Sequence, residues 1–194
     1  MSRTMPRTPP TERIGEAFED VLAAAREGAD WAVNILFRSL QPRLLRFLRA
    51  GLGHDADDVA SQAWLEVARA LPRFTGGEDD FAALLFTVAR RRAADHRRAM
   101  RRRPASPGGD EALATMADSH DTEDDVIARL RGEDAARQIA AILPADQAEI
   151  VLLRVAGGFS AEEVAAIVGR RAGTVRVLQH RALRRLAEKL GDDL

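Results

Sequence analysis

The sequence contains no cysteine and no long apolar run. Without cysteine, the chain cannot form a disulfide, a cysteine-ligated zinc site or a thiol nucleophile. No apolar stretch approaches the ~18 residues that a membrane-spanning helix needs, and the first residues lack the apolar core of a signal peptide. We therefore expect a cytoplasmic protein that does not insert into a membrane.

Signatures of catalysis and of metal binding are also missing. No glycine-rich phosphate-binding motif is present, and no local pattern indicates a Ser-His-Asp group. The four histidines, at positions 54, 96, 120 and 180, share no metal-ligand spacing. We expect neither an enzyme nor a bound cofactor or metal ion.

Charge is distributed unevenly along a chain whose formal net charge is only −1. Positions 81–103 hold eight arginines and one aspartate, for a net +7, and positions 154–190 hold eight basic and three acidic residues, for a net +5. Between them, positions 104–134 hold nine acids and two arginines, for a net −7. Because salt screens charges beyond ~8–10 Å, the local basic blocks decide the attraction to phosphate.

Apolar residues recur at helical spacing, and no alternating strand pattern is present, so we predict an all-α fold. The predicted organisation is a Pro- and Thr-rich tail over 1–12 and a helical domain over 13–103. A flexible acidic linker over 104–121 then leads to a second helical domain over 122–194, whose helical pattern resumes near Thr122.

Glycine, proline and capping residues predict the helix boundaries of the first domain. Gly28 ends the first helix, and Pro42 predicts a kink or a break in the second. Asp55 is the expected N-cap of the third helix, and Phe81 is the expected first residue of the fourth.

Both tryptophans fall within the apolar stripes of these helices. Trp31 and Ile35 belong to the stripe of the second helix, and Trp64 belongs to that of the third. We therefore expect the two indoles in the core rather than as platforms on which bases stack.

Positions 160–186 predict a helix-turn-helix. Ser160 followed by Glu163 is a capping box that marks the start of one helix, and Gly169 supplies the turn before a second helix that begins near Ala172. Early residues of such a helix reach base edges in the major groove, while its arginines contact phosphate. The outward-facing residues of the second helix are therefore DNA-binding candidates: Thr174, Arg176, Val177, His180, Arg181 and Arg184.

These residues alone leave simpler interpretations open. The helix pair also reads as an amphipathic hairpin with a solvated arginine face. Asp57 and Asp58 can equally be explained as helix-capping or solvated acids. The arginines after position 89 can be explained as the solvated end of a helix.

Two regions together resemble RNA polymerase sigma factors of the extracytoplasmic-function class. "HDADDVASQAWLEVARALPRF" is similar to the family's helix that docks on the clamp helices of core polymerase. "FAALLFTVARRRAADHRR" is similar to the next segment, which meets the minus-ten promoter element. "LPADQAEIVLLRVAGGFSAEEVAAIVGRRAGTVRVLQHRALRRL" is similar to the family's helix-turn-helix that reads the minus-35 element. The regions occur in the family's order.

The resemblance implies roles for individual residues. Polymerase contact falls on Asp57, Asp58, Ser61 and Gln62, of which the last two stand where the family usually has Gln and Glu. The resemblance assigns the minus-ten element to a loop that holds a flipped base and to a helix end that follows the phosphates of the strand. The residues concerned are Phe74, Arg90, Arg91, Asp95, His96, Arg97 and Arg98. Arg171, which replaces the customary capping serine, joins the minus-35 set.

The partners implied by the resemblance are core RNA polymerase, promoter DNA and an inhibitory anti-sigma factor. A rival interpretation is a stand-alone helix-turn-helix regulator that binds duplex DNA without polymerase. A second rival is a helical interaction protein with no role on DNA, against which the two basic blocks argue.

Overall fold

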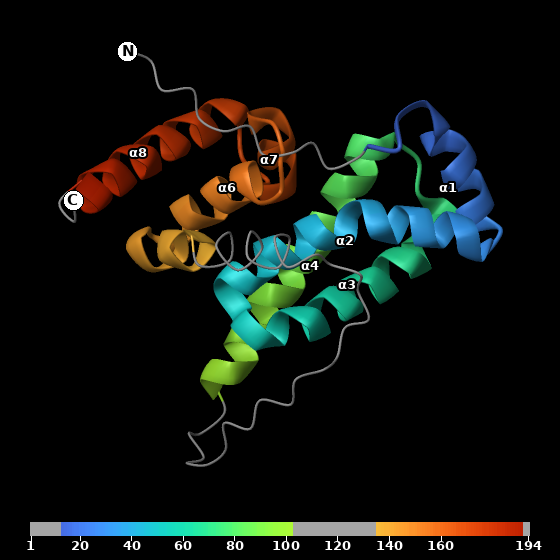
Figure 1. Cartoon of the computed structure of the whole chain (residues 1–194), viewed down its shortest axis with the longest axis horizontal. Helices are drawn as coiled ribbons and strands as arrows, with labels where there is room; N and C mark the ends of the chain where they lie inside the picture. The colour runs from blue at the N-terminus through green and yellow to red at the C-terminus, as the bar shows by residue number, and fades with distance from the viewer. Residues whose placement is uncertain (1–12, 103–134, 192–194) are drawn as a thin grey trace, which may run out of the picture.

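The computed structural model describes residues 13–102 and 135–191, and within these ranges it contains helices and no strand, as predicted (Figure 1). The predicted tail (1–12), linker (104–121) and helix start near Thr122 lie outside the described residues. The helices of the first unit are α1 (Phe18–Arg26), α2 (Asp30–Leu52), α3 (Ala56–Ala70) and α4 (Glu78–Arg102), with short 3-10 turns η1 (Gly15–Ala17), η2 (Gly53–Asp55) and η3 (Leu71–Arg73). The second unit holds a helical segment over 135–142, then α6 (Ala145–Val155), α7 (Ala161–Val168) and α8 (Ala172–Gly191).

The first unit is a four-helix arrangement in which α4 runs along both α2 and α3 (Figure 1). Its core holds fully buried side chains from all three helices, including Leu44, Leu48, Val59, Val67 and Leu85. Gly28, with a φ of 82°, lies in the connection between α1 and α2, so the predicted end of the first helix is confirmed.

Pro42 does not break α2, which is assigned as one helix from Asp30 to Leu52. Proline lacks the amide hydrogen that would bond to the carbonyl of residue 38, so one helical hydrogen bond is lost. Leu36 and Leu40 before the proline, and Leu44 and Leu48 after it, all lie in the same core. Burial of this continuous stripe offsets the missing bond, so of the predicted kink or break the break does not occur.

The prediction for Trp31 is also wrong, because this indole is 55% exposed and Ile35 is 39% exposed. The buried stripe of α2 begins at Ala32 and Leu36, and a residue one position earlier lies ~100° around the helix. Trp64 is half-buried against the core, and its Nε1 donates a hydrogen bond to Gln41 Oε1 at 2.7 Å.

Asp55 is the N-cap residue of α3, as predicted, whereas the predicted start of the fourth helix differs from the structure. Asp55 precedes α3, but its side chain makes no capping hydrogen bond. Its carboxylate instead lies 3.0 Å from Nε2 of His96 and 3.3 Å from Nε2 of His54. α4 begins at Glu78, three residues before Phe81, because three successive acids at 78–80 favour the positive end of the helix dipole.

The second unit contains the predicted helix-turn-helix, formed by α7 and α8, which both pack against α6. The capping box is present: Ser160 Oγ accepts from the amide of Glu163, whose carboxylate accepts from the amide of Ser160. Gly169 is left-handed with a φ of 68°, and α8 begins at Ala172 as predicted. Val175, Ala182 and Leu186 face the interior.

The two units pack against each other, and buried residues from both belong to one continuous hydrophobic cluster. α7 lies against α4, and α6 lies against α2. No helix in the described ranges is long and apolar enough to cross a membrane.

Candidate nucleic-acid and polymerase interfaces

Three successive arginines of α4, Arg90 to Arg92, pair with acids from neighbouring helices. Arg91 and Arg92 both donate to the carboxylate of Glu66 on α3, with Arg92 Nη2 2.7 Å from Oε2. The hydrogen bond from Arg91 is the largest cause that lowers the pKa of Glu66 below its ordinary value of 4.5. Glu66 therefore stays ionised at neutral pH and fixes the direction of two adjacent guanidinium groups.

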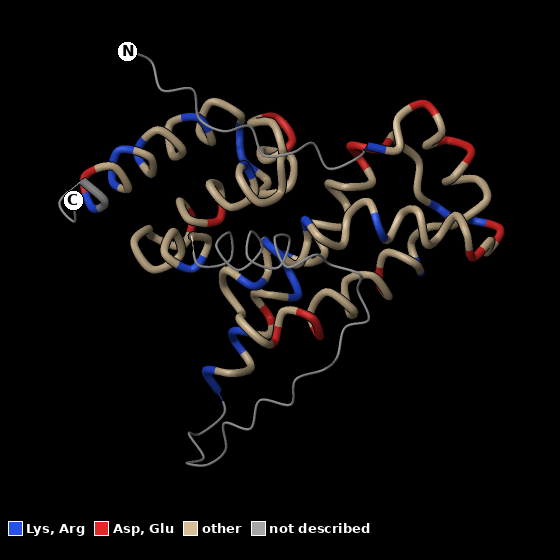
Figure 2. Tube along the Cα trace, in the orientation of Figure 1, with Lys and Arg blue, Asp and Glu red and all other residues tan. Residues whose placement is uncertain are grey.

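Further along α4, the candidate residues for strand contact have distinct surroundings. His96 Nε2 lies 3.0 Å from Asp55 Oδ2, and Arg98 pairs with Asp95 at 2.9 Å on the exposed surface. The guanidinium of Arg97 lies close to Gly51, where an added Cβ would be only 3.3 Å from its Nη1. Figure 2 shows the basic residues gathered towards the end of α4.

Arg90 differs from the others because its partner is in the second unit. Its Nε lies 2.7 Å from Oε1 of Glu149 on α6. Arg90, one of the predicted DNA-contact residues, is therefore already engaged in an ion pair between the two units.

The loop before α4 is built around Phe74, which is half-buried with its ring edge-on to Phe81. The backbone carbonyl of Phe74 accepts a hydrogen bond from Arg26. Gly76 has a φ of +149°, and a Cβ there would lie 2.8 Å from Cβ of Asp80. The loop therefore requires glycine at this position, and it places Phe74 at the rim of the core.

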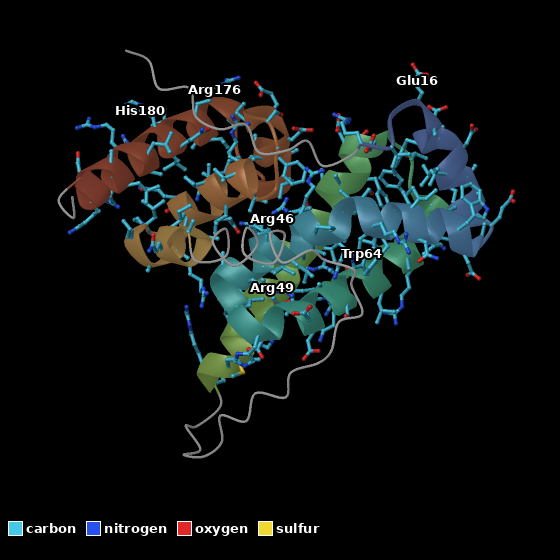
Figure 3. The ribbon with its side chains drawn as sticks, in the orientation of Figure 1. Glu16, Arg46, Arg49, Trp64, Arg176 and His180 are labelled. Atoms are coloured by element: carbon cyan, nitrogen blue, oxygen red, sulfur yellow. The ribbon has the colours of Figure 1, made fainter. Side chains whose placement is uncertain are left out.

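The candidate residues for the minus-35 element lie on α8 or directly before it. All are exposed: Arg171, which precedes α8, and Thr174, Arg176, Val177, His180, Arg181 and Arg184 on the helix. Figure 3 shows Arg176 and His180 on the side of α8 that faces away from α6. Arg176 pairs with Glu162 of α7 on the exposed surface.

The motif "GGFS" at positions 157–160 forms the turn between α6 and α7, and the geometry of this turn explains its residues. Arg154 donates to the carbonyl of Phe159. A Cβ on Gly157 would lie only 2.8 Å from the ring of Phe159, so a side chain at 157 cannot be accommodated without movement. Gly158, with a φ of 71°, occupies the left-handed region.

The four predicted polymerase-contact residues lie on the exposed face of α3: Asp57, Asp58, Ser61 and Gln62. Asp57 pairs with Arg49 of α2 at 3.3 Å. The sequence analysis missed two exposed apolar neighbours, Leu65 (60% exposed) and Phe37 (40% exposed), of which Phe37 packs on Trp64 with ring centroids 5.3 Å apart. The sequence could have indicated Leu65 as exposed, because it lies one turn after Ser61 and outside the buried stripe of α3.

A groove of about 980 Å³ runs between α4 and the second unit. Its apolar floor includes Phe47 and Leu48, and arginines from both units line its walls. Among the described residues, no group of three or more His, Cys, Asp or Glu side chains could hold a metal ion.

Comparisons with known proteins match both units. Residues 36–103 match the family model Sigma-70 region 2, and residues 133–186 match the model Sigma-70, region 4. The ECF RNA polymerase sigma factor SigD of Mycobacterium tuberculosis is 35% identical over 204 residues, which cover 96% of this chain and 90% of SigD. ShbA of Streptomyces griseus, also an ECF RNA polymerase sigma factor, is 36% identical over 173 residues, covering 84% of this chain and 89% of ShbA.

The fold is also that of a solved structure, CnrH in complex with the cytosolic domain of CnrY. The TM-score is 0.67 at 22% sequence identity, and the match covers 92% of this chain and 100% of that chain.

Proposed function

The chain belongs to the sigma-70 family, in its extracytoplasmic-function class, and from this membership we propose how its residues direct core RNA polymerase to promoters. As a sigma factor it directs promoter-specific transcription initiation, and its family is not an enzyme class. The observation that carries this conclusion is the presence of both regions in one chain whose similarity to such factors extends over 96% of its length. Polymerase and promoter DNA lie in the cytoplasm, where we expect the chain to act.

We assign the minus-ten element to the first unit. The loop around Phe74 holds a base removed from the stack, and Arg91, Arg97 and Arg98 follow the phosphates of the opened strand, with Arg90, Asp95 and His96 beside them. Removing a base from the stack costs a few kcal/mol, which aromatic and cationic contacts can offset. The support is the fixed loop geometry at Gly76, the hydrogen bond from Arg91 to Glu66, and the exposed position of Arg98 further along α4.

We assign the minus-35 element to the exposed surface of α8. Thr174, Arg176 and Val177 lie in the first two turns, where a recognition helix meets base edges. Arg171, His180, Arg181 and Arg184 flank these positions, and we assign them to phosphate or groove contacts.

We place the polymerase contact on the exposed face of α3. Asp57, Asp58, Ser61 and Gln62 supply its polar part, and Leu65 with Phe37 supplies an apolar part. An apolar centre with a polar rim is the usual composition of a specific protein interface.

The likeness to CnrH supports one further partner. That protein was solved in complex with the cytosolic domain of CnrY, and the resemblance to its class implies an inhibitory anti-sigma factor. We therefore propose that a protein of this kind controls the present chain.

Run-off transcription tests the proposal. The purified chain is mixed with core RNA polymerase and a pool of genomic promoter fragments, and core-dependent transcripts are expected. Arg181→Ala should lower transcription by weakening a DNA contact. The control Arg185→Ala removes an arginine that is also exposed but lies outside the assigned set, and it should leave transcription near the wild-type level. Absence of core-dependent transcripts, with tight duplex binding by the chain alone, would favour the stand-alone regulator.

A further inference from the structure

The loop that carries Phe74 is held at its first residue by a side chain of α1. Arg26, in the last turn of α1, donates a hydrogen bond to the backbone carbonyl of Phe74. Because the peptide group is planar, a hydrogen bond to its carbonyl also fixes the direction in which the chain enters the loop. Arg26 therefore sets the position of the loop over residues 74–77 from a helix that precedes it by almost fifty residues.

The residues that follow the loop are bonded to the chain just before α1. The side chain of Glu78, the first residue of α4, is only 16% exposed, and its carboxylate accepts from the backbone amides of Ile14 at 2.9 Å and Gly15 at 3.0 Å. Arg13 pairs with Asp79 at 2.5 Å, and its Nε lies 3.6 Å from the carboxylate of Glu78. Figure 1 shows this part of the chain beside the start of α4. The loop is thus held at both of its ends.

Aromatic packing also connects α1 to the loop. Phe81 of α4 is 1% exposed, and its ring contacts Phe18 of α1 with centroids 6.1 Å apart and Phe74 with centroids 5.5 Å apart. We call the contacting residues on the α1 side the N-terminal clamp: Arg13, Ile14, Gly15, Phe18 and Arg26. The family model for region 2 matches residues 36–103, so every residue of the clamp lies before the matched segment.

The exposure of Arg26 separates a positioning role from a role in global stability. Arg26 is exposed, and a hydrogen bond from an exposed side chain adds little to the stability of a whole domain. The core already holds α1 through Phe18, Val21 and Leu22. The hydrogen bond instead restricts the loop, and a loop that is ordered beforehand avoids the loss of affinity that ordering on binding would cause.

We propose that the N-terminal clamp is a positioning device for the minus-ten site: by holding the loop at both ends, it keeps the loop in the conformation that receives the flipped base. This inference rests on the proposed function of the loop around Phe74. Arg26 and Glu78 act through the loop and do not need to touch DNA. Removal of either side chain therefore weakens the capture of the base, although one removal takes away a positive charge and the other a negative charge.

Promoter DNA that lacks a single base provides the test. The chain is assembled with core RNA polymerase, and its affinity is measured for a promoter fragment recovered by run-off transcription. The fragment is either intact or carries one abasic nucleotide, placed in turn at each position of the nontemplate strand of the minus-ten element. The wild type should lose affinity most at the position whose base is flipped, and Phe74→Ala should remove most of that difference.

Arg26→Ala and Glu78→Ala should each bind the intact fragment about three- to tenfold more weakly than wild type, the factor that one net hydrogen bond represents. On the fragment without the flipped base, both should bind as wild type does. An effect of charge alone would change the two affinities in opposite directions. The matched controls are Arg38→Ala, at an exposed arginine of α2, and Glu16→Ala, at an exposed acid of η1, and both should bind each fragment as wild type does.

Two results would overturn the role of the clamp. One is a folded Arg26→Ala variant that loses the same factor of affinity on the intact and the abasic fragment, as a direct phosphate contact would cause. The other is a folded Arg26→Ala variant that binds both fragments as wild type does. Far-UV circular dichroism, a cooperative melt and an unchanged titration with core polymerase verify the fold of each variant. If no abasic position weakens binding by the wild type, the proposed function of the loop itself fails, so the two failures are distinguishable.

Discussion

Glu66 pairs with Arg91 and Arg92 in the basic half of α4, and its pKa provides a test. Its folded pKa lies below the ordinary value of 4.5, so its contribution to stability is complete above that value and is lost as the pH falls through the folded pKa. We expect Glu66→Gln to lower the free energy of unfolding at pH 7. The difference from wild type should shrink as the pH falls towards 3, as measured by denaturant unfolding across that range. A difference that stays constant would contradict the ion-pair account.

Gly76 and Gly173 form a matched pair of glycines. Gly76 has a φ of +149° and no space for a Cβ, whereas a Cβ on Gly173 would meet nothing within 4 Å. We expect Gly76→Ala to destabilise the protein by about 1–3 kcal/mol and Gly173→Ala, which lies in a helix, to stabilise it by about 0.4–1 kcal/mol. Thermal unfolding of both variants provides the comparison. Equal effects would show that the loop conformation is not required.

Leu65 is already exposed, so it can contact polymerase without a change of conformation. Its substitution therefore tests the assigned polymerase surface. Truncating a leucine buried in an interface removes about 1.5–3 kcal/mol of apolar burial, or roughly a tenfold to hundredfold loss of affinity. Leu65→Ala should therefore weaken binding to core polymerase by at least about tenfold in a titration. Met100→Ala, which truncates an exposed apolar side chain at the end of α4, should bind as wild type does. Equal affinities for both variants would place the contact elsewhere.

At the scale of elements, the capping box of α7 gives the clearest prediction. Ser160→Ala removes the acceptor for the amide of Glu163, which lies 3.2 Å from Ser160 Oγ. A lost N-cap costs about 1 kcal/mol. Ser61→Ala is the control, because its hydroxyl is exposed and bonds only to a carbonyl one turn earlier, so a change within ~0.5 kcal/mol is expected. Calorimetry of the two variants would contradict the capping role if their melting temperatures matched.

Local patterns in the sequence predict the elements well where burial and chemistry agree. The capping box and Gly169 mark both ends of α7, and the structure confirms them. Pro42 misleads because its local preference opposes the tertiary burial of Leu40 and Leu44, and burial prevails. Trp31 misleads because size and apolarity do not reveal which side of α2 faces the core.

The candidate surfaces were predictable where the periodicity of one helix decides exposure, and not where side chains of separate helices meet. Exposure of the α8 set follows from the periodicity that buries Val175 and Ala182. The acids that hold the arginines of α4 were not predictable, since Glu66 and Glu149 lie 25 and 59 residues away from Arg91 and Arg90. Sequence patterns resolve neighbours on one helix, and such pairs form only when separate helices pack.

At the scale of the whole molecule, the contact between the units is the feature that the sequence did not indicate. Phe159 has a local explanation as part of the helix-turn-helix turn, and Phe86 has one as part of a buried stripe. Their rings, with centroids 4.7 Å apart, meet only in three dimensions, where one hydrophobic cluster runs through both units. The same contact pairs Arg90 of α4 with Glu149 of α6.

The central claim is that this chain reads a promoter only when mounted on core RNA polymerase. The most direct measurement is its affinity for one duplex promoter fragment, determined with and without core polymerase at the same salt concentration, because DNA affinities depend strongly on salt. The account predicts sequence-specific binding and strand opening with core polymerase, and only weak, non-specific binding by the chain alone. Tight and sequence-specific binding of the intact duplex by the isolated chain would contradict it.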